Sequence, residues 1–325
     1  MRAPSNSAPA AGDIDLTPVH GTRKTPLAWI ETALFRGLIG GISRLPWSWV
    51  SALAGGLARL AKRLDRRHTE AARGFLTTAL GPDLDSEERE RLILRAYRHM
   101  VLVALESERF HGERAVPELR RRYEVIAEPG LREQLQDSGV VIITAHVGNW
   151  ELSSAVIADW LGKPFYAVAK PPKNYYFSRY VQASRESRGV YVLPRRGAMS
   201  KAPKVLAAGG ALGMLLDQRA RTRPVMAEFF GRTARCDRSA GVLLRRLSMP
   251  MLFLSSERLE GAEAPGRDGP YFRMRLGPLW SAEEFAGSRP EEIARRINAE
   301  FERMILARPD QYLWLHDRYK EADPA

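Results

Sequence analysis

The sequence places a histidine and a carboxylate where a strand gives way to a helix. Residues 140–144 are apolar or β-branched, and Asn149 can cap a helical pattern that starts at Trp150. His146 therefore follows the carboxyl end of a strand, where open α/β sheets bind their ligands. Glu151 would lie in the first turn of the helix. A carboxylate beside a neutral imidazole orients it as a general base for a hydroxyl, so His146 and Glu151 are the candidate catalytic residues.

A lone histidine near a glutamate is more often a surface or packing residue. Here the run His-Val-Gly-Asn-Trp-Glu from His146 resembles the His-x4-(Asp/Glu) motif of the glycerolipid acyltransferase superfamily, in the form found in the lipid A biosynthesis lauroyl/myristoyl acyltransferases. The resemblance continues at Asp217-Gln218, at Phe229-Phe230-Gly231 and at residues 309–320, Pro-Asp-Gln-Tyr-Leu-Trp-Leu-His-Asp-Arg-Tyr-Lys. It covers roughly residues 85 to 320.

This resemblance implies that an acceptor hydroxyl or amine, deprotonated by His146, attacks an acyl thioester directly. The implied donor is acyl carrier protein or coenzyme A as a co-substrate, with no cofactor, and the implied acceptor is a lipid A precursor or another anionic glycolipid. No serine or cysteine nucleophile stands beside the base, so no acyl-enzyme is required. The negative oxygen of the intermediate would need backbone N–H groups or a basic side chain nearby. We expect a monomer at the cytoplasmic face of the bacterial inner membrane.

Further polar residues are predicted at the same edge of the sheet. Arg195 and Arg196 follow a predicted strand, and a guanidinium can hold a phosphate through two hydrogen bonds. Asp217 and Gln218 end another strand, where they would bind substrate, or where Asp217 would pair with an arginine. The candidate substrate-binding residues are Asn149, Lys173, Arg195, Arg196, Asp217 and Gln218. Three other arginines of this basic stretch fit a solvated helix face: Arg179, Arg185 and Arg188.

The elements that must position these residues alternate along the chain. Strands are predicted at 140–144, 165–169, 190–193, 211–216, 249–255 and 271–276, and helices near 149–161, 174–188, 199–208 and 290–306. An earlier helix, capped by Asp85 or Ser86, would serve packing alone. The alternation predicts an α/β fold with a mostly parallel mixed central sheet flanked by helices. Residues 68–325 are assigned to this acyltransferase domain.

Residues 27–67 have a different pattern. Apolar residues recur every three or four positions in two helices hinged near Pro46, and the longest charge-free run, residues 45–58, is too short to span a bilayer. Tryptophans suited to the headgroup level are Trp29, Trp47 and Trp49, and the cations that would meet anionic lipid are Arg59, Lys62, Arg63, Arg66 and Arg67. We predict an interfacial helical anchor. A helical hairpin packed on the catalytic domain is the alternative, and both can hold at once.

Residues 1–26 lack apolar periodicity and are predicted to be a disordered leader without the apolar core of a signal peptide. The net charge of +12 over 325 residues favours an anionic partner. The single cysteine, Cys236, excludes an internal disulfide framework. Two rival classes remain: a catalytically idle membrane-binding scaffold, and a nucleic-acid binder suggested only by a pI near 10.1. We expect no nucleic-acid partner, and among acyltransferases another glycolipid, a lysophospholipid or an amino-lipid is the alternative acceptor.

Overall fold

The computed structural model describes residues 19–81 and 84–320. Most of the predicted disordered leader, residues 1–18, lies outside the described residues. The end of that leader is ordered, because the backbone N–H of Arg23 donates to the carbonyl of Lys173 (3.0 Å) and the N–H of Tyr175 donates to the carbonyl of Arg23 (3.1 Å). The predicted leader therefore ends before residue 26.

The centre of the fold is a seven-stranded sheet in the order β1-β9-β8-β2-β5-β3-β4. The strands are β1 (Tyr123–Ile126), β2 (Val140–Thr144), β3 (Phe165–Ala169), β4 (Val190–Pro194), β5 (Ala211–Leu215), β8 (Met251–Leu259) and β9 (Tyr271–Trp280). Neighbouring strands run parallel except for β8 and β9, which are antiparallel. This confirms the predicted mostly parallel mixed sheet.

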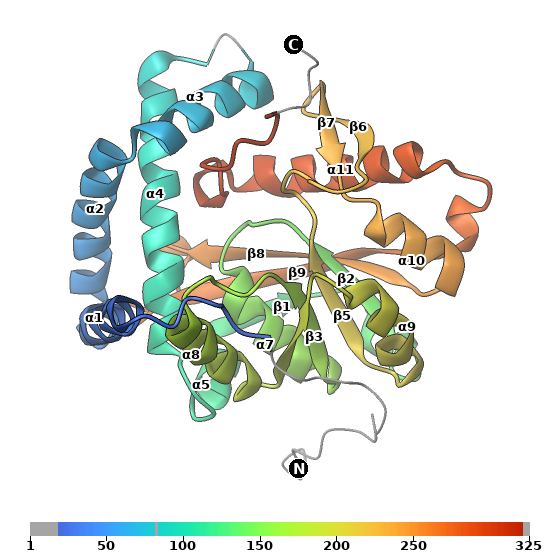
Figure 1. Ribbon diagram of the computed structural model, residues 1–325, viewed down its shortest axis with the longest axis horizontal. Coiled ribbons are helices and arrows are strands. Elements are labelled where there is room, and N and C mark those ends of the chain that lie inside the picture. Colours follow the sequence, from blue (N-terminus) through green and yellow to red (C-terminus); the bar gives the residue numbers. More distant parts are fainter. Residues whose placement is uncertain (1–18, 82–83, 321–325) are drawn as a thin grey trace.

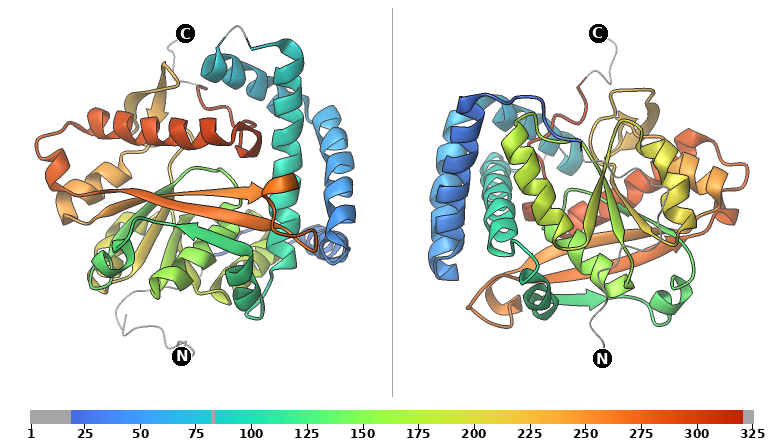
Figure 2. Two further views of the ribbon diagram at one scale, coloured as in Figure 1. Left: turned by 180° about the vertical axis from the view of Figure 1, so that it is seen from behind. Right: turned by 60° about the horizontal axis from the view of Figure 1, so that its bottom comes forward.

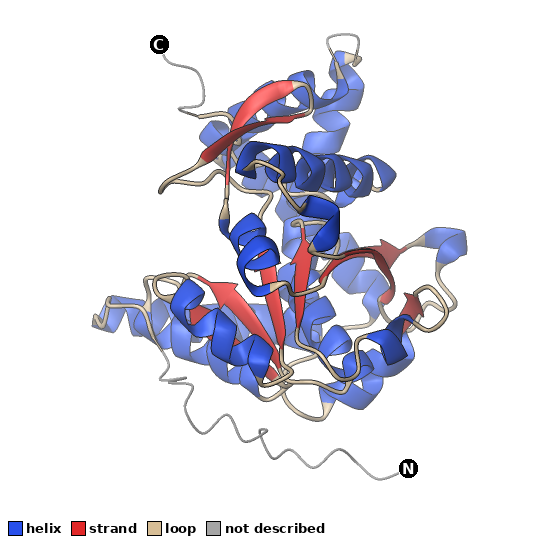
Figure 3. Ribbon diagram, turned by 90° about the vertical axis from the view of Figure 1, so that its right-hand side faces the viewer, coloured by secondary structure: helices blue, strands red, loops and turns tan. Residues whose placement is uncertain are grey.

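Helices cover both faces of the sheet (Figures 1 and 3). Alternate residues of β2 serve the two sides, because Val140 and Ile142 pack into the core under α5 and α7, whereas Val141 and Ile143 pack into the core under α9, α10 and α11. The helices that flank the sheet are α5 (Ala115–Arg122), α6 (Leu131–Gln134), α7 (Trp150–Leu161), α8 (Tyr175–Glu186), α9 (Ala198–Ala207), α10 (Ser239–Leu247) and α11 (Pro290–Ala307).

Four helices cover one side of the domain, and the first two of them are the helices predicted within residues 27–67. The helices are α1 (Pro26–Ser43), α2 (Trp47–Leu64), α3 (Arg66–Leu80) and α4 (Ser86–Arg109). Figures 1 and 2 show α1 and α2 against α4, and Val50 and Ala54 of α2 are buried against Leu102 and Leu105 of α4. Both helices therefore pack on the domain, as the alternative prediction required, but α1 lies crosswise to α2 in Figure 1, so the two helices form a corner and not a hairpin. No helix within residues 19–81 and 84–320 is both long enough and apolar enough to cross a bilayer.

One hairpin was not predicted. Strands β6 (Val225–Phe229) and β7 (Arg232–Cys236) pair antiparallel beside α11, and their turn is made by Phe230 and Gly231 at φ values of 51° and 69°. A two-residue turn with both φ values positive normally carries Asn-Gly or Asp-Gly. Because Phe-Gly is not such a signal, the sequence did not reveal the turn.

Candidate active site

The register of two adjacent parallel strands brings His146 and Asp217 together. Thr144 at the end of β2 lies opposite Leu215 at the end of β5, so the residues two positions further on are also neighbours. The His146 Nδ1 atom is 2.7 Å from Oδ1 of Asp217, and the backbone N–H of His146 donates to Oδ2 at 3.1 Å. Asp217 thus holds both the ring and the backbone of His146 at the carboxyl edge of the sheet.

The two side chains have unequal access to solvent. The Asp217 side chain is 1% exposed and the His146 side chain 16%. Burial would raise the pKa of Asp217, but attraction to His146 and the two hydrogen bonds from that residue outweigh it and lower the pKa. An ionised Asp217 accepts the Nδ1–H of the imidazole, which leaves Nε2 as the free base nitrogen. Gln218 Nε2 lies 3.4 Å from it.

Glu151 does not contact the imidazole of His146, which was its predicted position. Its carboxylate forms a two-pronged pair with Arg185 of α8, with Arg185 Nε at 2.9 Å from Oε2 and Nη2 on Oε1. The early position of Glu151 in α7 turns its side chain toward α8, and Asp217 takes the place at the imidazole. Burial would raise the pKa of Glu151, but Arg185, followed by Arg188 and His146, lowers it. The negative charge of Glu151 therefore lies near His146 without orienting the ring.

The Glu151–Arg185 pair gives a testable prediction. Its side chains are 23% and 18% exposed, so Glu151→Gln leaves a largely buried guanidinium poorly compensated. We expect a loss of about 1–3 kcal/mol in the free energy of unfolding and about a tenfold loss of transfer activity. Urea melts and steady-state rates measure the two effects. An E151Q protein with wild-type stability and rate would contradict any role for the pair.

The loop between β2 and α7 is fixed from several sides. Gly148 has φ +59° and lies against the carbonyl of Ser256 so closely that an added Cβ would come within 2.0 Å of that oxygen. This explains why the motif needs glycine there. The Asn149 Oδ1 atom accepts the backbone N–H of Leu152 (3.1 Å), and its Nδ2 donates to Glu106 (2.8 Å). Asn149 therefore caps α7. Because it is fully buried, it does not bind substrate, which was its predicted role.

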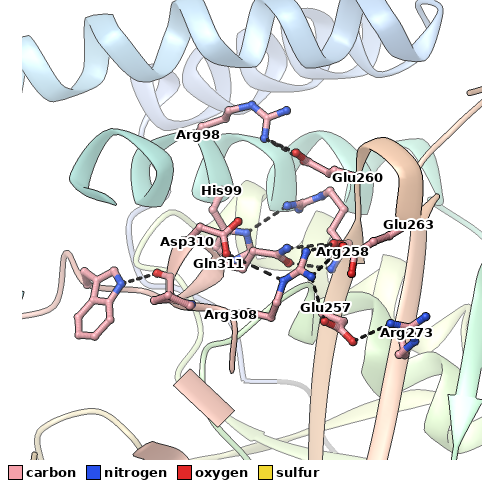
Figure 4. A network of polar contacts seen from close by, with 12 residues as sticks. Arg98, His99, Glu257, Arg258, Glu260, Glu263, Arg273, Arg308, Asp310 and Gln311 are labelled. Carbon is pink, nitrogen blue, oxygen red and sulfur yellow. Dashed lines mark hydrogen bonds and ion pairs between the residues drawn. The ribbon is translucent and has the colours of Figure 1, made fainter. Parts of the chain in front are cut away.

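A polar network around the buried Arg258 supports that loop, and Figure 4 shows its contacts with His99 and Gln311. Arg258 of β8 pairs with Glu106 of α4 through two contacts, one of them at 2.7 Å, and its Nη1 lies 3.3 Å from Nδ1 of His99. Gln311 accepts the backbone N–H of Arg258 (2.7 Å) and donates to its carbonyl (2.9 Å), while the Gln311 carbonyl accepts the N–H of Gly148 (3.0 Å). The network thus ties α4, β8 and the C-terminal segment to the histidine loop.

The closing motif of the sequence lies against the site. Tyr312 is bridged to Val147 by its backbone and hydrogen-bonds to Asp217 by its side chain, and the backbone N–H of Leu313 donates to the carbonyl of His146 (3.2 Å). Arg318 is fully buried, donating to the Arg235 carbonyl (2.8 Å) and lying 3.2 Å from the Cys236 sulfur. The segment therefore packs against the histidine loop and holds it in position. Arg318 is buried away from any substrate.

His316 in this segment should titrate during acid unfolding. Burial, opposed in part by Asp217, lowers its pKa from 6.5 to about 4, and its Nε2 accepts the backbone N–H of Arg219 (3.1 Å). Between those values the unfolded chain binds the proton and the folded one does not, so stability falls as the pH drops from 6.5 toward 4. His316→Gln should melt with a shallower pH dependence in this window. An identical dependence in calorimetry would refute the assignment.

The basic candidates lie further along the same edge. Arg195 and Arg196 are exposed at the end of β4, and Arg195 Nη2 is 3.5 Å from Asp237. Strands β5 and β3 stand between β4 and β2, so at about 4.8 Å per strand these arginines lie roughly 14 Å across the sheet from the histidine. The exposed Lys173 follows β3. Of the candidates, the structure brings only Asp217 and Gln218 directly to His146.

Two arginines expected on a solvated face lie inside the fold. Arg185 pairs with Glu151, and the side chain of Arg188 donates to the carbonyl of Phe110 (3.0 Å) with the residue 5% exposed. Arg188 follows the end of α8, where the chain turns back into β4 beside α7. The basic stretch therefore contributes two internal cations next to the catalytic helix, which its charge pattern did not reveal.

Known proteins resemble this chain over most of its length. The chain is 25% identical over 283 residues to a lipid A biosynthesis palmitoleoyltransferase of Escherichia coli (strain K12), an alignment that spans 85% of this chain and 87% of the relative. It is 22% identical over 299 residues to a lipid A biosynthesis lauroyltransferase of the same organism, spanning 91% and 92% of the two chains. Residues 21–321 match the family described as bacterial lipid A biosynthesis acyltransferase, so the chain belongs to that family and is an acyltransferase.

Proposed function

We propose that this protein transfers a fatty acyl chain from a thioester of acyl carrier protein or coenzyme A to a hydroxyl of a lipid A precursor or a similar anionic glycolipid. The observation that supports the reaction is the pairing of His146 with buried Asp217 at the carboxyl edge of the sheet, which leaves one ring nitrogen free. Membership of the acyltransferase family supports the substrate class.

The chemistry follows from that free nitrogen. His146 Nε2 takes the proton of the acceptor hydroxyl as its oxygen attacks the thioester carbonyl carbon, and Asp217 stabilises the imidazolium that forms. The tetrahedral intermediate then collapses with loss of the thiolate, which receives the proton back from the imidazolium. Cys236 takes no part as a nucleophile, because it is buried with its sulfur 3.2 Å from Asn298 and from Arg318.

The negative oxygen of the intermediate needs a donor close to His146. The backbone N–H groups of Val147 and Gly148 already donate to the carbonyls of Ala145 (2.8 Å) and Gln311 (3.0 Å). The Gln218 carboxamide, 3.4 Å from His146 Nε2, is a neutral donor beside the reacting atoms, and the N-terminal end of α7 adds a favourable partial positive charge. We assign this role to Gln218.

Arg195 and Arg196 suit an acceptor phosphate at a distance from the reacting hydroxyl. Both are exposed at the edge that carries His146, and a bidentate guanidinium–phosphate contact contributes roughly 1.5–3 kcal/mol. We expect Arg195→Ala or Arg196→Ala to slow acylation of a phosphorylated acceptor by about tenfold or more, with a much smaller effect on its dephosphorylated counterpart. Rates on the two acceptors, with one donor, measure this.

Arg179 provides the matched control for these variants, because it is exposed on the neighbouring α8 and lies with its guanidinium carbon 5.8 Å from the Tyr175 ring centroid. Arg179→Ala should leave the ratio of the two rates unchanged. Equal slowing on both acceptors by Arg195→Ala and Arg196→Ala, in variants that melt like wild type, would assign these arginines to the donor's phosphates instead.

Membrane docking through α1 and α2 is part of the proposal. The outward faces of these helices carry exposed large apolar residues, including Leu34 at 67%, Trp49 at 64% and Leu60 at 53%. Such residues at single positions are common, but their concentration on two consecutive helices is typical of an interfacial surface. These helices would place the catalytic edge near its lipid substrate at the cytoplasmic face of the inner membrane.

A direct assay tests the proposed activity. Purified protein is incubated with an acyl thioester of acyl carrier protein or of coenzyme A and with a lipid A precursor in mixed micelles. We expect mass spectrometry to show an acceptor heavier by one acyl chain together with an equal amount of free thiol. Lipids of cells with and without the protein should show the same difference. Thiol release without acylated lipid would indicate a thioesterase. Activity confined to a lysophospholipid would show that the acceptor is a lysophospholipid and not a glycolipid.

A further inference from the structure

A basic pocket lies away from the histidine site, where α2, α3 and α4 meet. Its volume is about 670 Å³. Its lining comes from Arg59, Lys62, Arg63, Arg66, Thr69, Glu70, Arg73, Glu90 and Leu94. Glu90 precedes His99 on α4 by nine residues, which separates the pocket from the catalytic region by roughly 14 Å along the helix axis. The size is in the range of small-molecule sites.

Part of the charge in this pocket is neutralised internally. Glu90 pairs with Lys62 (2.6 Å) and with Arg73 (2.6 Å), and Glu70 also pairs with Arg73 (2.8 Å). Hydrogen bonds from Arg73 first and then Lys62 lower the pKa of Glu90 to about 2, although burial would raise it. Glu90 therefore stays ionised and neutralises cations of the lining. The five cations and two carboxylates of the lining leave a net charge of +3.

That excess charge resides on three arginines. Arg59, Arg63 and Arg66 are exposed, and no ion pair joins them to another residue among the described parts of the chain. Arg59 and Arg63 are one helical turn apart on α2, and Arg66 begins α3 just past the bend at Asp65. Three guanidinium groups around one hollow match the several oxygens of a phosphate group.

The pocket comes nearest the apolar stripe of α2 at Arg63 and extends away from it to Lys62, which lies about 170° from the middle of the stripe. At about 100° per residue, the exposed residues Trp49, Leu53, Leu60 and Leu64 fall within a sector of roughly 60° on the helix. Arg63 lies about 70° from the middle of that sector and Arg59 about 110° from it, on the same side, whereas the buried Ala54 and Ala58 lie on the opposite side. A molecule held by these arginines would thus have an apolar surface beside it.

We infer that this pocket binds the phosphate head group of an anionic phospholipid, whose acyl chains lie along the leucine stripe of α2. The inference deepens the proposed membrane docking by giving it one discrete lipid site. A concave site next to exposed leucines fits a lipid better than an acidic protein, which would need a broad polar surface. The lipid would fix how α1 and α2 sit on the bilayer, and with them the direction in which the histidine edge faces.

The test compares two full-length variants that lose the same charge. The pocket variant is R59Q/R63Q/R66Q, and the control variant is R121Q/R132Q/R295Q, whose arginines are also exposed but lie on α5, α6 and α11. Sedimentation measures binding to phosphatidylcholine vesicles with and without about one fifth phosphatidylglycerol. We expect the pocket variant to lose more than tenfold in affinity for the anionic vesicles and the control variant less than threefold, with equal binding to the neutral ones.

Calorimetric titration with soluble dihexanoyl phosphatidylglycerol tests the pocket without a bilayer. Saturable binding at one site per chain, lost in the pocket variant and kept in the control, is the expected result. Equal losses in the two variants would overturn the discrete site in favour of diffuse charge attraction. Displacement of vesicle-bound protein by millimolar inorganic phosphate would overturn the lipid assignment in favour of a free phosphate.

Two further arms separate the possible failures. L53S/L60S/L64S should weaken binding to both kinds of vesicle. Unchanged binding would refute membrane docking through α2, while the calorimetric result would still decide whether the pocket binds a lipid. The pocket variant should also retain the same fraction of wild-type activity with acyl carrier protein thioesters as with coenzyme A thioesters. A loss confined to the acyl carrier protein donor, with normal vesicle binding, would assign the pocket to that acidic protein and overturn the inference.

Discussion

Replacing His146 by alanine is expected to slow acyl transfer by about a hundredfold or more, because it removes the proposed general base for the acceptor hydroxyl. The imidazole is the group at the strand–helix junction with a free nitrogen, and Asp217 cannot take its place because its carboxylate is 1% exposed behind the ring. Single-turnover assays with saturating donor isolate the chemical step from product release. The loss should therefore appear in that step and not only in the apparent affinity for either substrate.

His68 supplies the control for this variant, since it is an exposed histidine on α3 whose ring contacts Asp65. His68→Ala should keep wild-type turnover. His68→Ala should melt near the wild-type temperature. His146→Ala should still unfold cooperatively but lose about 1–3 kcal/mol in the free energy of unfolding, because it leaves the buried Asp217 carboxylate without the imidazole. A His146→Ala protein that turns over like wild type would refute the general-base mechanism.

Replacing Asp217 by asparagine is expected to slow transfer by roughly 10²–10⁴. The carboxylate accepts the Nδ1–H of His146 at 2.7 Å and the backbone N–H at 3.1 Å, and a carboxamide offers one acceptor atom and no charge. The ring would lose the tautomer that frees Nε2, and the imidazolium would lose its nearby negative charge. Transfer rates and a melting curve for D217N measure the effect separately from unfolding.

Comparison with E151Q shows which carboxylate serves the base. The structure predicts a larger rate loss for D217N than for E151Q, because Glu151 is engaged by Arg185. The opposite order, with D217N near wild type, would return the orienting role to Glu151.

The sequence predicted the strands around the site well. Residues 140–144 and 165–169 match β2 and β3, because their short apolar runs are bounded by glycine or proline and followed by helical patterns. The His146–Asp217 contact needed the register of β2 on β5, which places two residues 71 positions apart side by side. The His-x4-Glu motif instead favoured Glu151, which is close to His146 in sequence. Its side chain points from α7 toward α8, where it pairs with Arg185. Sequence spacing alone could not distinguish these two carboxylates.

Charge patterns were the least informative feature. Arg185 and Arg188 resemble surface cations in sequence but are held between α7, α8 and the end of α4. The amphipathic pattern of residues 27–67 predicted both helices correctly, yet it could not show which of their apolar residues, such as Val50 and Ala54, pack on α4 and which, such as Leu34 and Leu60, stay exposed. Tertiary packing decides both outcomes, and neither leaves a local signal.

A double-mutant cycle tests the central claim, that Asp217 acts through His146, most directly. Transfer rates are measured for wild type, His146→Ala, Asp217→Asn and the double variant under single-turnover conditions. If the pair works as one unit, removing the carboxylate after the imidazole is gone costs nothing further, and the double variant is no slower than the slower single variant. Losses that multiply in the double variant would show that the two residues act independently and would contradict the mechanism.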